Sequence, residues 1–376
     1  MCILPFIMMG GKSVWSWLIL TLGVGVAVES ATVGTALEEL LEHELEDSAE
    51  WIRIPTEVGE WIWTHRRSIE VLLKRRGPRV KPDDVEFLLY TGQDDADTGQ
   101  RLGLLEGEYD FATSNFRPER PTRVIVHGWL NSRSSPFVER LRHAYLARWD
   151  YNVIVVDWSN CAKLWNYIRA VKCVPVVGQS LALLLDELHR QRQLQLDSVY
   201  VVGHSLGAHI AGIAGKRVQH GPIHTIVALD PALPLFSMHA PENRISAQDA
   251  RYVEVMHTNG GLFGFLRPIG TADFYPNGGS HQPGCGLPVD WLCSHSRAWE
   301  LFVESLLEPD ENLLASRVDS LNEVQNLPGQ LMGSGQTLQG VTPIEQRVKM
   351  GGEPSSAGFA RGLYVIDTRD RSPFFE

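Results

Sequence analysis

The sequence predicts an α/β fold with a mostly parallel central sheet and helices on both faces. Short apolar runs rich in β-branched residues recur from about residue 84 onward, and longer amphipathic stretches separate them. The runs lack strict apolar–polar alternation, which is typical of strands that are buried on both faces. Strands that alternate with helices in this way favour a parallel sheet covered on both sides.

The individual elements follow from these patterns. The expected strands are the runs at 85–91, 123–129, 152–158, 198–205, 225–231 and 251–258. The expected helices are the stretches at 176–192, 206–217 and 295–307. In the first of these, apolar residues recur every three or four positions, which is the spacing of one helix face.

Composition excludes some classes of protein. With 376 residues, of which 44% are hydrophobic, the chain can bury a large core. The formal net charge of −11 gives no general attraction to nucleic acid or to anionic membranes. We therefore expect no nucleic-acid partner, and we expect any contact with lipid to be apolar or to use a local basic patch.

The first 80 residues differ from the rest. Lys12 precedes an apolar run over 14–28, shorter than the roughly 20 residues of a membrane span, and small residues follow it. This pattern predicts a signal peptide over 1–30 and a secreted, extracellular protein, with an uncleaved anchor as the alternative. Residues 31–80 form an extension that is first acidic and then basic, and this extension is a candidate prosegment. Residues 81–376 are expected to form a single catalytic domain.

Four cysteines remain once the signal peptide, with Cys2, is removed: Cys161, Cys173, Cys285 and Cys293. An even number in an exported chain predicts two disulfides, and three pairings are possible. We favour Cys161–Cys173 with Cys285–Cys293, which closes two short loops. Buried free thiols are the alternative.

The segment Gly203-His204-Ser205-Leu206-Gly207 matches G-x-S-x-G, and it lies between an expected strand and an expected helix. In that context the motif presents a nucleophilic serine on a strained turn, where side chains in place of the two glycines would clash. We therefore predict Ser205 as a nucleophile on an α/β-hydrolase fold.

A serine nucleophile needs a base and a carboxylate that orients the base, and in this fold they follow it in the order Asp, His. Asp230 ends the strand after Ser205, and Asp249 is the rival acid. His295 is the preferred base because it opens a predicted helix beside a predicted disulfide, with His257 and His281 as alternatives.

The oxyanion of the tetrahedral intermediate requires two backbone N–H donors. One is expected from Leu206, the residue after the nucleophile. The other is expected from Trp129, in the His-Gly-Trp turn that ends an early strand. The alternative for this turn is a tight packing role.

The motifs FLLYT, VIVHGW, NVIVVDW, VGHSLGAH, LDPALPLF, DARYVEVMHTN, DFYPNGGSHQPGC and CSHSRA follow one another in this order. Together they resemble the pancreatic-lipase family of animal lipases, most closely its insect branch of neutral lipases and phospholipases A1. The resemblance covers about 84–310, with a fainter end at 362–364. It implies a lipid ester hydrolase without cofactor, with catalytic Ser205, Asp230 and His295 and the oxyanion donors Trp129 and Leu206.

The resemblance also places the family's lid between Cys285 and Cys293. The lid here is short, with the apolar residues Leu287, Val289, Trp291 and Leu292, and the neighbouring loop at 260–272 is short as well. A short lid and loop resemble the phospholipase A1 members, and triacylglycerol lipase is the close alternative. The lid residues, and Phe263 and Phe265, are candidates for contact with a lipid surface or for ordinary loop packing.

Departures from the family shape the remaining expectations. We expect no lipid-binding domain after the catalytic domain, and therefore no colipase-type partner. Where some relatives bind calcium, only Asp249 is retained, and a hard cation needs several carboxylates, so we expect no metal. A non-catalytic binding protein, like the insect yolk proteins that resemble these lipases, is the second alternative. Those proteins lose the serine that this chain keeps.

Overall fold

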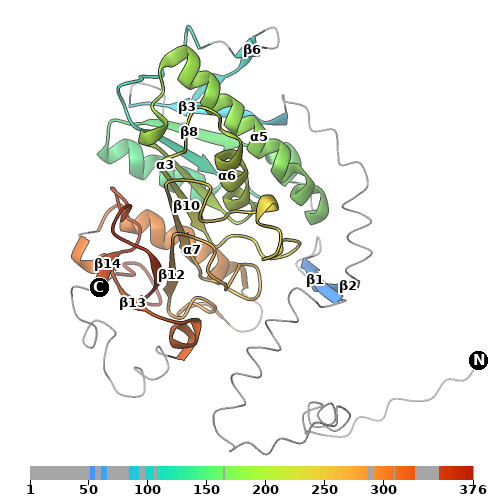
Figure 1. Ribbon diagram of the computed structural model, residues 1–376, viewed down its shortest axis with the longest axis vertical. Coiled ribbons are helices and arrows are strands. Elements are labelled where there is room, and N and C mark those ends of the chain that lie inside the picture. The colour runs from blue at the N-terminus through green and yellow to red at the C-terminus, as the bar shows by residue number, and fades with distance from the viewer. Residues whose placement is uncertain are drawn as a thin grey trace, which may run out of the picture. The chain divides into compact units, whose positions relative to one another are not determined.

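The computed structural model describes residues 51–55, 61–65, 84–92, 98–105, 108–109, 111–163, 166–286, 291–308, 310–326 and 347–375 (Figure 1). The predicted signal peptide and most of the predicted prosegment lie outside these residues. Within the extension, β1 (Trp51–Pro55) and β2 (Trp61–His65) form an antiparallel pair.

The described part of the chain forms an 11-stranded sheet in the order β14-β13-β15-β12-β11-β10-β9-β7-β8-β3-β4. The seven strands from β15 to β8 are parallel to their neighbours: β7 (Thr122–Val126), β8 (Asn152–Asp157), β9 (Val199–His204), β10 (Thr225–Leu229), β11 (Tyr252–Met256), β12 (Ala272–Pro276) and β15 (Gly362–Ile366). The edge strands pair antiparallel: β3 (Glu86–Tyr90), β4 (Gln100–Leu102), β13 (Leu314–Val318) and β14 (Arg347–Lys349). A separate two-stranded pair joins β5 (Leu104–Leu105) and β6 (Glu108–Tyr109).

The predicted fold class is confirmed, and all six predicted strands form. Several end earlier than predicted: the run at 123–129, for example, leaves the sheet after Val126. The apolar pattern continues past the strand because the residues that follow it are buried in loops at the carboxyl edge. The sequence pattern therefore marks burial better than it marks the end of hydrogen bonding.

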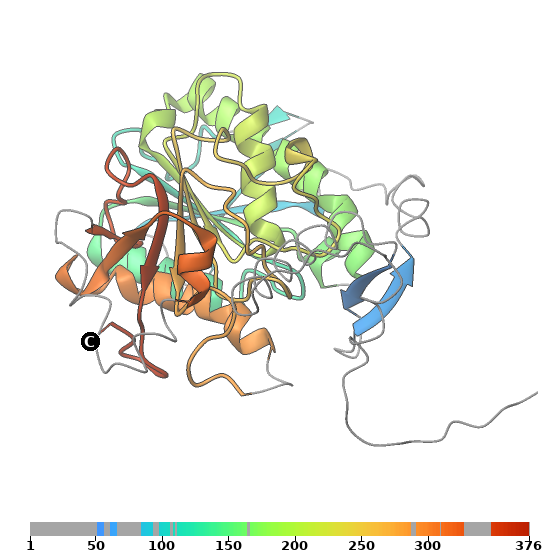
Figure 2. The same ribbon diagram turned by 60° about the horizontal axis from the view of Figure 1, so that its bottom comes forward.

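Helices cover both faces of the sheet (Figures 1 and 2). They are α3 (Pro136–Arg148), the short α4 (Ser159–Ala162), α5 (Tyr167–Arg192), α6 (Leu206–Arg217) and α7 (Trp291–Ser305), with 3-10 turns η3 (Leu196–Ser198), η4 (Pro241–Asn243) and η5 (Asp310–Leu313). Two predicted starts were wrong. Helix α5 begins before Pro175, capped by the Asn166 side chain, and α7 begins before His295, which therefore lies inside the helix.

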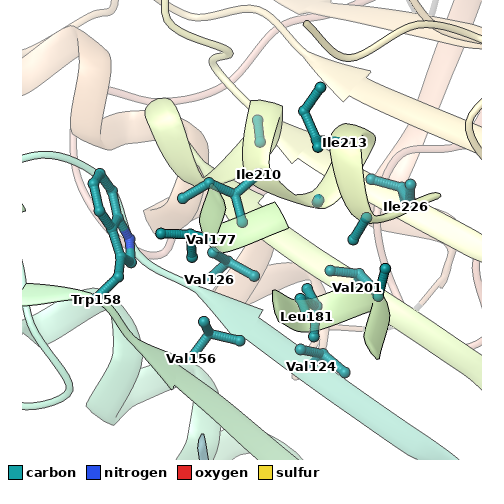
Figure 3. Packing of buried hydrophobic residues seen from close by; sticks show 14 of the residues in the cluster. Val124, Val126, Val156, Trp158, Val177, Leu181, Val201, Ile210, Ile213 and Ile226 are labelled. Atoms are coloured by element: carbon teal, nitrogen blue, oxygen red, sulfur yellow. The ribbon is translucent and has the colours of Figure 1, made fainter. Parts of the chain in front are cut away.

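Two apolar layers enclose the sheet. One packs Val124, Val126 and Val201 of the sheet against α5 and α6 (Figure 3). The other packs the alternate residues, such as Ile125 and Val155, against α3 and α7. Successive side chains along a strand point to opposite faces of the sheet. Because both faces are covered by an apolar layer, the strands are apolar throughout.

Helix α5 is long and apolar enough to span a membrane by length and composition. Its residues belong to the core layer, however, and it packs along α6. A core helix of a soluble fold meets the same length criterion, so this helix gives no support for a membrane span.

Both favoured disulfides form. Cys161, in α4, pairs with Cys173, in α5, and Cys285 pairs with Cys293, in α7. The two bridges flank the carboxyl edge of the sheet, one beside the turn after β7 and the other beside His295.

Glu254 lies on β11 and is fully buried. Its carboxylate accepts hydrogen bonds from the Gly351 amide at 2.7 Å and from the Tyr252 hydroxyl at 3.1 Å. Burial raises the pKa of Glu254 from 4.5 to about 7, although these two hydrogen bonds and the Lys349 charge oppose the shift. The native state therefore holds a proton that the unfolded state releases near pH 4.5.

Replacing Glu254 with glutamine is expected to remove a pH dependence of stability. Because the folded-state pKa is raised, the native protein loses stability as the pH rises from about 4.5 to about 7, by roughly 3 kcal/mol in total. Glu254→Gln keeps an acceptor for Gly351 and does not titrate. Denaturant unfolding from pH 5 to pH 8 measures the difference, with the exposed Glu139→Gln on α3 as control. Parallel pH profiles of the wild type and Glu254→Gln would contradict the assignment.

Candidate active site

Ser205 lies at the sharp turn between β9 and α6, with φ of 58° and ψ of −122°. Neither glycine of the motif can be replaced by a residue with a side chain. A Cβ on Gly203 would lie 2.4 Å from the Gly207 carbonyl oxygen, and one on Gly207 would lie 2.2 Å from the Val126 carbonyl oxygen. The strained turn therefore depends on both glycines, and it places Ser205 at the carboxyl edge of the sheet.

Asp230 and His295 meet at the same edge. Asp230 follows β10, the neighbour of β9, and His204 pairs with Leu229 in the strand register. Ser205 and Asp230 are thus the next residues on adjacent strands, and the Ser205 amide donates to the Leu229 carbonyl at 3.0 Å. The Nδ1 atom of His295 lies 2.6 Å from Oδ2 of Asp230. This is the contact that orients an imidazole for base catalysis.

The other oxygen of the Asp230 carboxylate is also held. Oδ1 accepts from the Thr258 amide at 2.8 Å and from the Asn259 amide at 3.0 Å. Gly264 packs against the same carboxylate, where a Cβ would lie 2.4 Å from Oδ1. These contacts fix the orientation of the carboxylate that faces His295.

His295 is held by contacts beyond Asp230. The His204 ring lies 4.7 Å from the His295 ring, and its Nε2 donates to the His295 carbonyl at 3.0 Å. The Phe263 ring lies 5.5 Å from the His295 ring. The Ser294 hydroxyl accepts from the Gln282 amide at 3.0 Å, next to the Cys293 bridge.

The turn after β7 lies directly beside the nucleophile. A Cβ on Gly128 would lie 2.8 Å from Cβ of Ser205 and 3.4 Å from its Oγ. Nδ1 of His127 donates to the Gly128 carbonyl at 2.9 Å, and Nε1 of Trp158 donates to the His127 carbonyl at 2.8 Å. The backbone of Trp129 is therefore fixed near Ser205, where the oxyanion donor is expected.

The rival candidates have other partners. Asp249 is buried and forms an ion pair with Lys216. His257 donates to the Phe265 carbonyl at 2.6 Å and contacts Asp273 at 2.9 Å. His281 is exposed.

The lid can be described only in part. Leu287 and Val289 lie outside the described residues, as does the side chain of Trp291, whereas Leu292 is 62% exposed. Of the two alternatives for Phe265, packing is confirmed and contact with a lipid surface is not, because Phe265 is buried in the core layer beside α6. Phe263 contacts His295 instead.

Sequence reasoning missed several members of this cluster. They are His204 as a donor to His295, the Phe263 ring, and the amides of Thr258 and Asn259 that bind Asp230. The amides carry no side-chain signal, and His204 occupies the variable position of G-x-S-x-G.

A model of the Lipase family matches residues 57–329. The chain belongs to this family. It is 35% identical over 235 residues to phospholipase A1 1 of Dolichovespula maculata, a match that covers 60% of this chain and 73% of the relative. It is 33% identical over 248 residues to pancreatic triacylglycerol lipase of Mus musculus, covering 60% of this chain and 52% of the relative. Pancreatic lipase-related protein 2 of Homo sapiens is 32% identical over 278 residues, a match that covers 66% of this chain and 56% of the relative.

The chain thus spans about half the length of the mammalian relatives. Membership in the Lipase family confirms the predicted resemblance and supports a carboxylic ester hydrolase as the enzyme class.

Proposed function

We propose that the protein is a secreted enzyme that cleaves the acyl esters of lipids through an acyl-enzyme on Ser205. The contact of 2.6 Å between His295 and Asp230, on the strand next to the one that carries Ser205, is the observation that supports this most directly. A carboxylate, an imidazole and a serine at one sheet edge form the arrangement that activates a hydroxyl.

The first half of the reaction forms the acyl-enzyme. Asp230 holds Nδ1 of His295, which leaves Nε2 to take the Ser205 proton while Oγ attacks the ester carbonyl carbon. The carbonyl oxygen becomes an oxyanion that accepts hydrogen bonds from the Trp129 and Leu206 amides. The intermediate then breaks its bond to the alcohol, which leaves with the proton from Nε2.

The second half restores the enzyme. Water loses a proton to Nε2 of His295 and attacks the acyl carbon, and the same two amides donate hydrogen bonds to the second oxyanion. The bond to Oγ breaks, Ser205 recovers the proton, and the fatty acid leaves. No cofactor is needed for these steps.

A phospholipid substrate is favoured slightly over a triglyceride. The loop between β11 and β12 folds down against Asp230, since Gly264 packs on its carboxylate and the Phe263 carbonyl accepts from the Leu233 amide at 2.7 Å. The lid between Cys285 and Cys293 is short. A more open site suits a polar head group beside the ester. The relatives include proteins named for phospholipase A1 and for triacylglycerol lipase, so the triglyceride is the second candidate.

An apolar rim supports a lipid substrate. Leu130 next to the oxyanion turn, Leu262 in the β11–β12 loop and Leu292 in the lid are 38%, 40% and 62% exposed. Secretion is supported by the predicted signal peptide and by two disulfides, which persist mainly in oxidising compartments.

Hydrolysis of a phospholipid, a galactolipid and a triglyceride by the purified mature protein is the test. We expect fatty acid to be released, with the phospholipid cleaved fastest of the three lipids. A triglyceride cleaved at least ten times faster would favour the second candidate. A fluorophosphonate probe separates an enzyme from a binding protein, because a Ser205 that never reacts would contradict the catalytic proposal.

A further inference from the structure

We propose that His204 is a positioning residue that sets the place of the base relative to the nucleophile, by donating its Nε2–H to the His295 backbone carbonyl. This inference rests on the proposed function. His204 touches neither substrate nor the transferred proton in this scheme. It acts through His295.

The geometry of the strand carries the argument. His204 is the last residue of β9 and directly precedes Ser205, whose own amide is fixed to the Leu229 carbonyl. The hydrogen bond of 3.0 Å from His204 reaches a residue 91 positions away, on α7. A single bond therefore connects the strand that carries the nucleophile to the backbone that carries the base.

The direction of this hydrogen bond is fixed by its acceptor. A backbone carbonyl can only accept, so the proton resides on Nε2 of His204. Burial, reinforced by the nearby His295, lowers the pKa of His204 to about 3. His204 is therefore neutral near pH 7, and it places no positive charge beside the His295 ring.

Packing completes the placement. The centre of the His204 ring lies 5.7 Å from that of the Phe137 ring and 4.7 Å from that of the His295 ring. A phenylalanine at 204 would fill much of the same space without a donor. A glutamine would carry an amide N–H at nearly the same distance from the backbone as Nε2. The two replacements separate space-filling from hydrogen bonding.

The experiment compares His204→Phe with His204→Gln in the full mature protein. The measurements are kcat and KM on a soluble short-chain p-nitrophenyl ester, the rate of labelling by a fluorophosphonate, and the melting temperature. Misplacement of a catalytic group by about 1 Å costs on the order of 100-fold in rate. We therefore expect His204→Phe to lower kcat and the labelling rate by roughly 10- to 100-fold, with KM unchanged, and His204→Gln to recover most of both.

His189→Phe is the matched control. His189, at the end of α5, also donates from its ring to a backbone carbonyl, that of Leu194, at 2.7 Å, but it lies away from the site. We expect its kcat to stay at the wild-type value. The control shows what loss of a similar bond does when only the fold depends on it.

Two results would overturn the inference: wild-type kcat and labelling in His204→Phe, or a folded His204→Gln that is as slow as His204→Phe. Ser205→Ala, assayed in parallel, separates this failure from a failure of the proposed function. An inactive Ser205→Ala beside a fully active His204→Phe would remove the positioning role alone. An active Ser205→Ala would remove both.

Discussion

Replacing Ser205 with alanine is expected to lower lipid hydrolysis by about 10⁶-fold, the loss typical of a serine triad without its nucleophile. Alanine has no oxygen to form the acyl-enzyme, and it fits the same turn between Gly203 and Gly207. Hydrolysis of the preferred lipid and labelling by a fluorophosphonate both report the loss.

Two further variants test the assignment. Asp230→Asn is expected to cost about 10⁴-fold, because an amide no longer holds the imidazole in the required tautomer. Ser180→Ala is the control, since this serine lies on α5 and its hydroxyl bonds to the Val176 carbonyl. Melting curves of all three variants should match the wild type closely enough to show folded protein. A folded Ser205→Ala with wild-type turnover would refute the mechanism.

Replacing Arg123 with methionine is expected to destabilise the protein by about 3–5 kcal/mol, the usual cost of removing one partner from a buried ion pair. Arg123 lies on β7, and its guanidinium binds both carboxylate oxygens of Glu353, at 2.8 and 3.0 Å. Both side chains are about 95% buried. Glu353 would then be left as a buried carboxylate without its cation.

The surroundings of Arg123 add to this cost. Its guanidinium lies 4.3 Å from the centre of the Tyr151 ring and 4.0 Å from that of Tyr200, and it donates to the Thr122 and Ser198 carbonyls. It lies at the amino ends of the strands, opposite Ser205. We therefore expect turnover per folded molecule to be unchanged.

Denaturant unfolding measures the stability effect, and a double-mutant cycle isolates the pair. Glu353→Leu alone should be destabilising as well, whereas Arg123→Met with Glu353→Leu should be less destabilised than the sum of the two. Strict additivity would show that the ion pair has no coupling energy. A change in kcat that tracks the loss of stability would contradict the separation of this region from the active site.

Much of the site could be predicted because local patterns and topology determine it together. The glycines of G-x-S-x-G mark the turn, and parallel strands bring their carboxyl ends to one edge, so Ser205 and Asp230 had to be neighbours. The start of α5 was missed because Pro175 is normally found in the first turn of a helix. Here Tyr167–Arg192 continues through it.

Contacts between distant positions could not be predicted. The bond from His204 to His295 spans 91 residues, and the pair of Arg123 with Glu353 spans 230. Nothing in the residues around His204 or Glu353 marks them as partners. Such contacts depend on how α7 and the C-terminal segment pack on the sheet, which no local pattern encodes.

The position of β15 has a consequence for biosynthesis. This strand, Gly362–Ile366, is inserted between β12 and β13, and it lies beyond the last residue of the family match, 329. A nascent chain that has emerged from the ribosome only to residue 329 contains Ser205, Asp230 and His295, but β12 and β13 still lack the strand that lies between them. Unpaired strand edges readily pair with other chains. We therefore expect the partial chain to be prone to aggregation until β15 has been synthesised and can pair with β12 and β13.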